Sequence, residues 1–287
     1  MTTIAAALGR AVRVDGDGRG RFEAGVELSS WPGIVHGGAL AAALDEAGRR
    51  LGGGDGPRRV EARLTASVPI ASALALEGEA REGGAAVSLV DRGQPLSMAT
   101  VAALGAPAAE AHEPPWRGGA TGFALPTSET CLACGAGNSL GLQLALAFDD
   151  EGVWVRTIPR AAWRADGGLH PALAPVVLDE VAWWLGALVM REGGLTNRIA
   201  VELLDPEALV AADGEIAAAG RFADVVAVDR RKTFWRTAVA LTGPDGRPLA
   251  RAAIVFRGGA EYSERQIPYF RPRTPPDVFR RMFPNHW

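Results

Sequence analysis

Two stretches of the chain place a histidine nine residues before an aspartate. In "PGIVHGGALAAALDEA" His36 precedes Asp45, and in "DGGLHPALAPVVLDEV" His170 precedes Asp179. The chain has four histidines, so half of them occupy this position. Both aspartates lie in apolar sequence, where a buried carboxylate is costly unless it is paired or used in chemistry. These stretches are therefore the candidates for a site.

The residue types favour chemistry at a carbonyl group. Backbone N–H groups at a helix start, here those of Gly37 and Gly38, can stabilise negative charge that develops on an oxygen. A carboxylate opposite them can activate water as a base or attack directly. His36 is predicted to position these groups rather than to transfer a proton. Neighbouring helical residues differ by about 100° in direction, so one residue of each Asp-Glu pair is expected to face the site.

The two stretches belong to an internal repeat. His36 matches His170 and Asp45 matches Asp179 at one constant offset, and similar strand-like segments follow each stretch. Each unit is predicted to be a strand, a helix and three or four further strands, for example a strand in "RFEAGVELS", where alternate residues are apolar. The helix from Pro171 to Met190 is apolar nearly all round, which predicts burial. The pattern predicts an α+β fold, with a long helix wrapped by an antiparallel sheet in each repeat.

The boundaries follow from composition. We predict an N-terminal repeat over 1–104, a linker over 105–130 rich in Pro, Ala and Gly, and a C-terminal repeat over 131–257. Residues 258–287 are expected to form an extension packed over the sheet, with a partner-binding arm as the alternative.

A single helix cannot bring its own start and its aspartate to one carbonyl, because nine residues span roughly 13 Å. Two helices packed antiparallel within the chain can, with their sheets joined edge to edge. The duplication then predicts two composite sites. One combines Gly37 and Gly38 with Asp179, and the other combines the residues after His170 with Asp45.

"GIVHGGALAAALDEA" resembles the central-helix motif of hotdog-fold acyl-CoA thioesterases, especially the phenylacetate-pathway and 4-hydroxybenzoyl-CoA thioesterase-like branch. "CLACGAGNSLGLQL" resembles the segment that enters the first strand in many members. The resemblance covers residues 20–104 and 131–257 and implies a tandem, double-hotdog chain. It departs at Ser30 and Arg164, where members often carry an Asn that holds substrate or water, and at His170-Pro171-Ala172, where Gly-Gly is expected.

The resemblance implies hydrolysis of acyl thioesters of coenzyme A or an acyl-carrier protein, without metal or other cofactor, with Asp179, Gly37, Gly38 and His36 as the catalytic set. The site with Asp45 and His170 is expected to be inactive, because Pro171 lacks the N–H that the first glycine supplies. Ser30 is the expected substrate contact. The alternatives are a noncatalytic acyl-CoA-binding module and a hotdog dehydratase or hydratase.

Arginines and one lysine at predicted turns are candidates for the coenzyme A phosphates; they are Arg58, Arg59, Arg230, Arg231 and Lys232. Trp183 and Trp184 either narrow an acyl tunnel or belong to the core. Cys131 and Cys134 are the only cysteines in the sequence. A structural turn is favoured over a zinc or redox site, because structural zinc sites have four ligands and this motif offers two.

The net charge of −3 with scattered charges gives no footprint for nucleic acid. The N-terminal segment lacks the pattern of a signal peptide, and no apolar run reaches membrane-spanning length. We therefore expect a cytoplasmic protein with no membrane partner, and a homodimer of such chains is possible.

Overall fold

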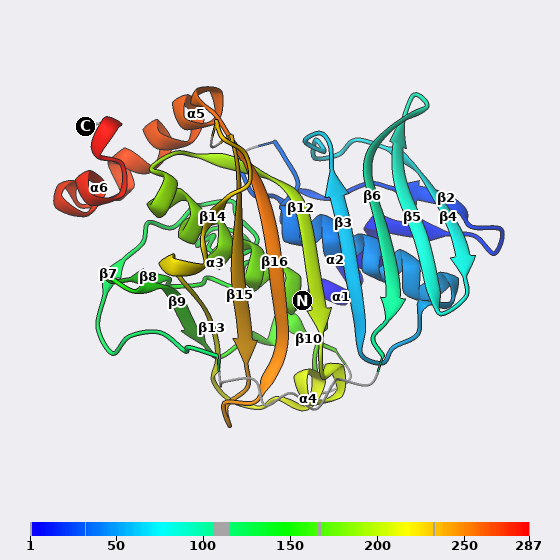
Figure 1. Ribbon diagram of the computed structural model, residues 1–287. Helices are drawn as coiled ribbons and strands as arrows, with labels where there is room; N and C mark the ends of the chain where they lie inside the picture. The colour runs from blue at the N-terminus through cyan, green and yellow to red at the C-terminus, as the bar shows by residue number, and fades with distance from the viewer. Residues whose placement is uncertain (1, 32, 106–114, 166–167, 232, 287) are drawn as a thin grey trace.

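The fold is built on one antiparallel sheet that runs through both halves of the chain. The computed structural model describes residues 2–31, 33–105, 115–165, 168–231 and 233–286. The sheet has 14 strands in the order β1-β2-β4-β5-β6-β3-β12-β16-β15-β13-β9-β8-β7, and β14 pairs with β15. Figure 1 shows the sheet in front and the two long helices, α2 and α3, together behind it.

The strands of the first half are β1 (Val12–Val14), β2 (Arg19–Phe22), β3 (Arg58–Leu64), β4 (Leu74–Arg81), β5 (Gly84–Asp91) and β6 (Gln94–Ala103). Those of the second half are β7 (Phe123–Ala124), β8 (Ala147–Phe148), β9 (Gly152–Thr157), β12 (Gly194–Leu203), β13 (Ile216–Arg221), β14 (Val226–Ala227), β15 (Phe234–Thr242) and β16 (Pro248–Gly258). A separate pair is formed by β10 (Arg164–Ala165) and β11 (Gly168–Leu169). The helices are α1 (Ile4–Ala11), α2 (Gly37–Gly48), α3 (Leu173–Met190), α4 (Pro206–Ala211), α5 (Ala260–Phe270) and α6 (Pro276–Met282).

The two halves meet where β3 pairs antiparallel with β12. Val60 lies opposite Val201 in this register, and both are buried toward the helices. Alternate residues of each strand point to opposite faces, so the apolar alternation of both strands covers one side of the sheet. The predicted edge-to-edge joining into one continuous sheet is confirmed.

The helices α2 and α3 run antiparallel, as predicted. The start of α2 meets Asp179 in α3, while Asp45 and Glu46 near its other end lie close enough to His170 to act on its charge. A Cβ on Gly38 would come within 2.3 Å of the Pro175 carbonyl oxygen, so this glycine allows the close crossing. Helix α3 is long and apolar enough to cross a membrane, but 78% of it is buried here, as in a core helix.

The structure adds to or changes three details of the predicted organisation. The segment "RFEAGVELS" is a strand only to Phe22; Val26–Leu28 form a 3₁₀ turn, in which Val26 is exposed. The predicted linker contains β7, which joins the sheet through β8; residues 106–114 lie outside the described residues. The C-terminal extension is helical (Figure 1). Phe270 of α5 packs on Trp184 of α3, Gln266 of α5 donates to the Gly194 carbonyl of β12, and Arg281 of α6 lies over Phe148 of β8.

Candidate active site

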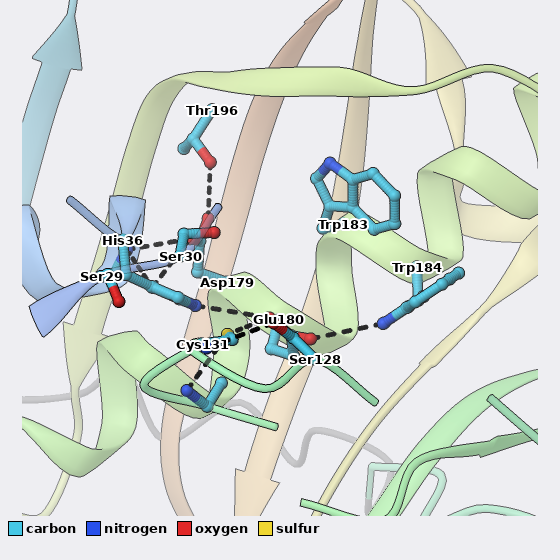
Figure 2. A network of polar contacts seen from close by, with 12 residues as sticks. Ser29, Ser30, His36, Ser128, Cys131, Asp179, Glu180, Trp183, Trp184 and Thr196 are labelled. Carbon is cyan, nitrogen blue, oxygen red and sulfur yellow. Dashed lines mark hydrogen bonds and ion pairs between the residues drawn. The ribbon is translucent and has the colours of Figure 1, made fainter. Parts of the chain in front are cut away.

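His36 forms the centre of the site. It is the N-cap of α2 and is almost fully buried. Its Nδ1 lies 3.4 Å from Asp179 Oδ2, and its Nε2 lies 3.3 Å from Glu180 Oε2 (Figure 2). Each ring nitrogen therefore faces a carboxylate from the other half of the chain. The fold brings His36 and Asp179 together, as the sequence predicted.

Asp179 is held by both of its oxygens. Oδ2 accepts a hydrogen bond from the Gly38 N–H at 2.8 Å, and Oδ1 accepts one from the Thr196 hydroxyl at 2.9 Å (Figure 2). The Gly38 N–H is thus engaged in orienting the carboxylate. Gly37 occupies the first helical position, where the N–H has no acceptor within its own helix, and it lines the cavity beside Asp179. Of the two glycines, Gly37 is the donor suited to an oxyanion.

Glu180 also reaches the site, which corrects the expectation that one residue of the Asp-Glu pair would do so. Asp179 and Glu180 point in different directions from α3, but the imidazole of His36 is wide enough to meet one carboxylate at each nitrogen. The other oxygen of Glu180 accepts a hydrogen bond from Trp184 Nε1 at 3.3 Å. The angle between neighbouring helical residues did not predict this, because it was applied to a single contact atom. An imidazole ring has two nitrogens on different sides, and each can meet one carboxylate.

The charges at the site are set by burial and by these contacts. Burial lowers the pKa of His36, but hydrogen bonds to Cys131 and Glu180 and the charge of Asp179 outweigh it and raise the pKa well above 6.5. Burial raises the pKa of Asp179, against the opposing effects of His36, Thr196 and Gly38. The pKa of Glu180 is lowered, because the contacts to His36 exceed the effect of its burial. These directions follow from a buried imidazole placed between two carboxylates.

The cysteines lie in the site rather than in a remote turn. Cys131 is buried, and its Sγ lies 3.7 Å from Glu180 Oε2. Burial raises the pKa of Cys131, but contacts to Cys134 and His36 outweigh it and lower the pKa to about 7. The "CLAC" motif was the available signal; sequence spacing alone cannot show that a loop of the second half folds against His36.

A cavity of about 140 Å³ connects these groups. Gly37, Asp179 and Thr196 line it beside the polar cluster. Its other end is aromatic, with Trp31, Trp183, Trp184 and Phe270 in the lining. Phe270 comes from α5, and its ring centroid lies 4.9 Å from that of Trp31 and 4.8 Å from that of Trp184. The C-terminal extension therefore closes the aromatic end.

The second composite arrangement lacks this geometry. Asp45 is held by Arg58, whose Nε and Nη2 each donate to it at 2.7 Å, and both residues are buried. The His170 Nδ1 accepts from Ala172 N–H at 3.2 Å, as His36 is placed to do with Gly38, but burial lowers its pKa. Pro171 precedes the N-cap Ala172 rather than opening α3. The bidentate pair gives Asp45 a structural partner.

This pair also corrects two expectations about cations. Arg58 was a candidate for coenzyme A phosphates but is buried against Asp45. Arg230 and Arg231 are exposed and lie outside the cavity lining. The cation in the lining is Arg257, whose side chain is 53% exposed and lies 4.0 Å from Glu261. Ser30, the expected substrate contact, does line the cavity.

Replacing Gly37 with Ala is expected to lower the turnover of a reaction catalysed at this site by roughly 10² while the protein stays folded. The new Cβ would lie 2.8 Å from Asp179 Oδ2 and 2.7 Å from Thr196 Oγ1, so these side chains must move and the carboxylate loses its position. The measurement is steady-state turnover together with a thermal melt. Gly9→Ala is the control, because a Cβ there meets nothing within 4 Å. A Gly37→Ala variant with normal kcat would contradict the importance of this geometry.

Comparisons with known proteins agree with this architecture. No family model matches the chain, and no curated protein matches it in sequence. A solved structure described as a putative thioesterase II from Thermobifida fusca superposes with a TM-score of 0.64 at 15% identity, covering 90% of this chain and 98% of that one.

A protein described as having the hot dog fold, from Alicyclobacillus acidocaldarius, superposes with a TM-score of 0.60 at 15% identity, covering 88% of this chain and 97% of that one. The GphF dehydratase superposes with a TM-score of 0.53 at 15% identity, covering 86% and 97%. These likenesses extend over nearly the whole of each chain, so they concern both halves and the sheet that joins them. The chain therefore has the hotdog fold, with two central helices against one continuous sheet.

Proposed function

We propose that the chain hydrolyses acyl thioesters, with Asp179 as the catalytic carboxylate. The observation that carries the proposal is the position of this group. Asp179 is buried, held by Gly38 and Thr196, and borders the cavity next to the first residue of α2. The carboxylate of such a pair can act as a base. The helix N-terminus that it faces is an electropositive partner for a carbonyl oxygen.

The steps follow from the groups present. The Gly37 N–H donates to the thioester oxygen as negative charge develops there. Asp179 takes a proton from a water molecule, whose oxygen bonds to the carbonyl carbon. The carbon–sulfur bond then breaks, and the departing thiolate takes the proton from Asp179. Thr196 donates to Asp179 Oδ1 and so keeps the carboxylate aimed at the cavity. Direct attack by Asp179 is the variant of the same chemistry.

The substrate is proposed to be an acyl-CoA or acyl-carrier-protein thioester with a compact acyl group. A cavity of about 150 Å³ holds a benzene ring, and this one is about 140 Å³ with an aromatic end closed by Phe270. Arg257 at the cavity is a suitable partner for a phosphate of the carrier. A cytoplasmic location is part of the proposal.

The second candidate function is that of a dehydratase or hydratase, because one similar structure is described as a dehydratase. That chemistry needs a histidine with a free nitrogen as base. Both nitrogens of His36 face carboxylates, at 3.4 and 3.3 Å. The geometry therefore favours hydrolysis.

A panel of acyl-CoA substrates, assayed for release of free thiol, tests the proposal. We expect thiol release from short acyl groups. Thermal stabilisation by acyl-CoA without thiol release would instead identify a noncatalytic binding module, and hydration of enoyl-CoA would identify the hydratase. Either result would overturn the proposed function.

Phe270→Ala is expected to shift the preference toward longer acyl groups. It opens the aromatic end of the cavity. Each additional buried methylene is worth about 0.8 kcal/mol, or roughly fourfold, so two additional buried methylenes give roughly 15-fold in kcat/KM for octanoyl-CoA relative to butyryl-CoA. Phe279→Ala is the matched control, since Phe279 is an equally buried side chain of the extension outside the cavity lining. An unchanged chain-length profile in Phe270→Ala would show that α5 does not set the limit.

A further inference from the structure

The cluster on the Nε2 side of His36 has a feature that thioester hydrolysis does not require. His36, Cys131 and Glu180 come from three distant parts of the chain, and all three are buried. One ligand atom of each lies within 4.8 Å of the other two. The Nε2–Oε2 distance is 3.3 Å and the Sγ–Oε2 distance is 3.7 Å. Figure 2 shows the three side chains converging below Asp179.

These spacings match the edges of a tetrahedral metal site. Zinc binds nitrogen and oxygen at about 2.0–2.2 Å and thiolate sulfur at about 2.3 Å, which places the ligand atoms of a tetrahedron roughly 3.3 to 3.7 Å apart. Imidazole, thiolate and carboxylate are all zinc ligands, and the mixture of a thiolate with an imidazole favours zinc over calcium or magnesium.

Each of the three groups also has an outer hydrogen-bond partner of the kind that orients metal ligands. The far nitrogen of His36, Nδ1, accepts a hydrogen bond from the Gly38 N–H at 3.1 Å and lies 3.4 Å from Asp179 Oδ2. The second oxygen of Glu180 accepts from Trp184 Nε1. The Cys131 sulfur accepts from the Ala133 N–H at 3.3 Å. The ring orientation, the carboxylate and the sulfur are thus all fixed before any ion binds.

The charge balance points the same way. The ion pairs of Asp179 and Glu180 both run to His36, so one imidazole faces two carboxylates and a thiol in a buried space. Buried charge of one sign is costly unless it is compensated. A divalent cation in place of the Nε2 proton and the thiol proton leaves the net charge of the cluster unchanged, so an ion can bind without adding buried charge, and the two protons are released to solvent.

We propose that His36 Nε2, Cys131 Sγ and Glu180 Oε2 bind a Zn²⁺ ion. The ion ties the loop that opens the second repeat to the start of α2 and to α3. That loop is already attached to the first half, because Leu132 N–H donates to the Ser29 carbonyl at 2.7 Å. The site goes beyond the proposed function, since it concerns metal binding and can be tested without any substrate.

The test uses the full chain, purified with a reductant, treated with chelator and dialysed. Zinc sulfate alone is then titrated into it by calorimetry, and Co²⁺ is added to a second sample to look for the thiolate-to-cobalt absorption band. Cys131→Ser and Glu180→Gln are the ligand variants. Glu46→Gln is the matched control, because Glu46 is the residue of the first repeat that corresponds to Glu180 and it pairs with Arg49 and Arg50. Circular dichroism checks that each variant is folded.

We expect one Zn²⁺ per chain in the unaltered protein and in Glu46→Gln. Each ligand variant is expected to weaken binding by more than about 100-fold, the upper range for loss of an orienting partner alone. Cys131→Ser should also abolish the cobalt–thiolate band. Failure of the reduced protein to bind zinc, or a cobalt band that survives in Cys131→Ser, would overturn the proposal. If Cys131→Ser fails to fold, Glu180→Gln decides by the same affinity criterion.

Discussion

Asp179→Asn is expected to lower kcat for thioester hydrolysis by roughly 10² to 10⁴ while the fold is retained, the range that a positioned general base contributes. Asparagine has nearly the same shape and its oxygen can still accept from Gly38 N–H or the Thr196 hydroxyl, but it cannot take a proton from water. The measurement is free-thiol release at saturating acyl-CoA, compared with the unaltered chain.

The stability of this variant has a definite sign. The pKa of Asp179 is raised by burial, so its ionised form costs folding free energy at a pH above both its folded and unfolded pKa values. A neutral side chain removes that cost, so the melting temperature of Asp179→Asn should be equal or higher at neutral pH. Loss of turnover with a lower melting temperature would instead attribute the defect to folding, and normal turnover would exclude Asp179 as the catalytic carboxylate.

Asp45→Asn is expected to have the opposite profile, with turnover per folded molecule preserved and stability reduced by about 3–5 kcal/mol. Arg58 is 1% exposed and donates two hydrogen bonds to Asp45, so the substitution leaves a buried guanidinium without its counterion. For a chain of this size the melting temperature should fall by roughly 6–20 °C. Thermal unfolding followed by circular dichroism measures it.

The double variant Asp45→Asn/Arg58→Met separates this explanation from others. Removing both charges eliminates the uncompensated buried cation, so we expect much of the lost stability to return. Additive losses in the double variant would show that the pair matters for another reason. A loss of kcat in Asp45→Asn as large as that in Asp179→Asn would mean that both halves carry chemistry and that the expected inequality of the two sites is wrong.

The proposed inequality of the two sites was predicted from sequence for a different reason from the one that supports it in the structure. Pro171 has no N–H, and this was the available signal. In the structure Pro171 lies before the helix, whereas the bidentate contact from Arg58 is what holds Asp45. No spacing rule relates residue 58 to residue 45, because the intervening chain leaves the helix and returns as β3.

Local sequence alone determined much of this protein. The constant offset between His36 and His170, and between Asp45 and Asp179, was sufficient to predict two antiparallel helices, the joined sheet and the meeting of His36 with Asp179. Those predictions succeed because helical rise and strand alternation are periodic, so spacing along the chain converts directly into position. The sequence indicated the aromatic end of the cavity only in part, through Trp183 and Trp184.

Tertiary packing alone decided the remainder: the engagement of Gly38 with Asp179, the second carboxylate on His36, the arrival of Cys131 beside it and the closing of the cavity by Phe270. Each of these contacts joins segments separated by many residues through loops, whose paths have no periodicity to read. Side chains so joined are neighbours because the sheet brings their elements together, and their hydrogen bonds and charges exist only after that packing has formed.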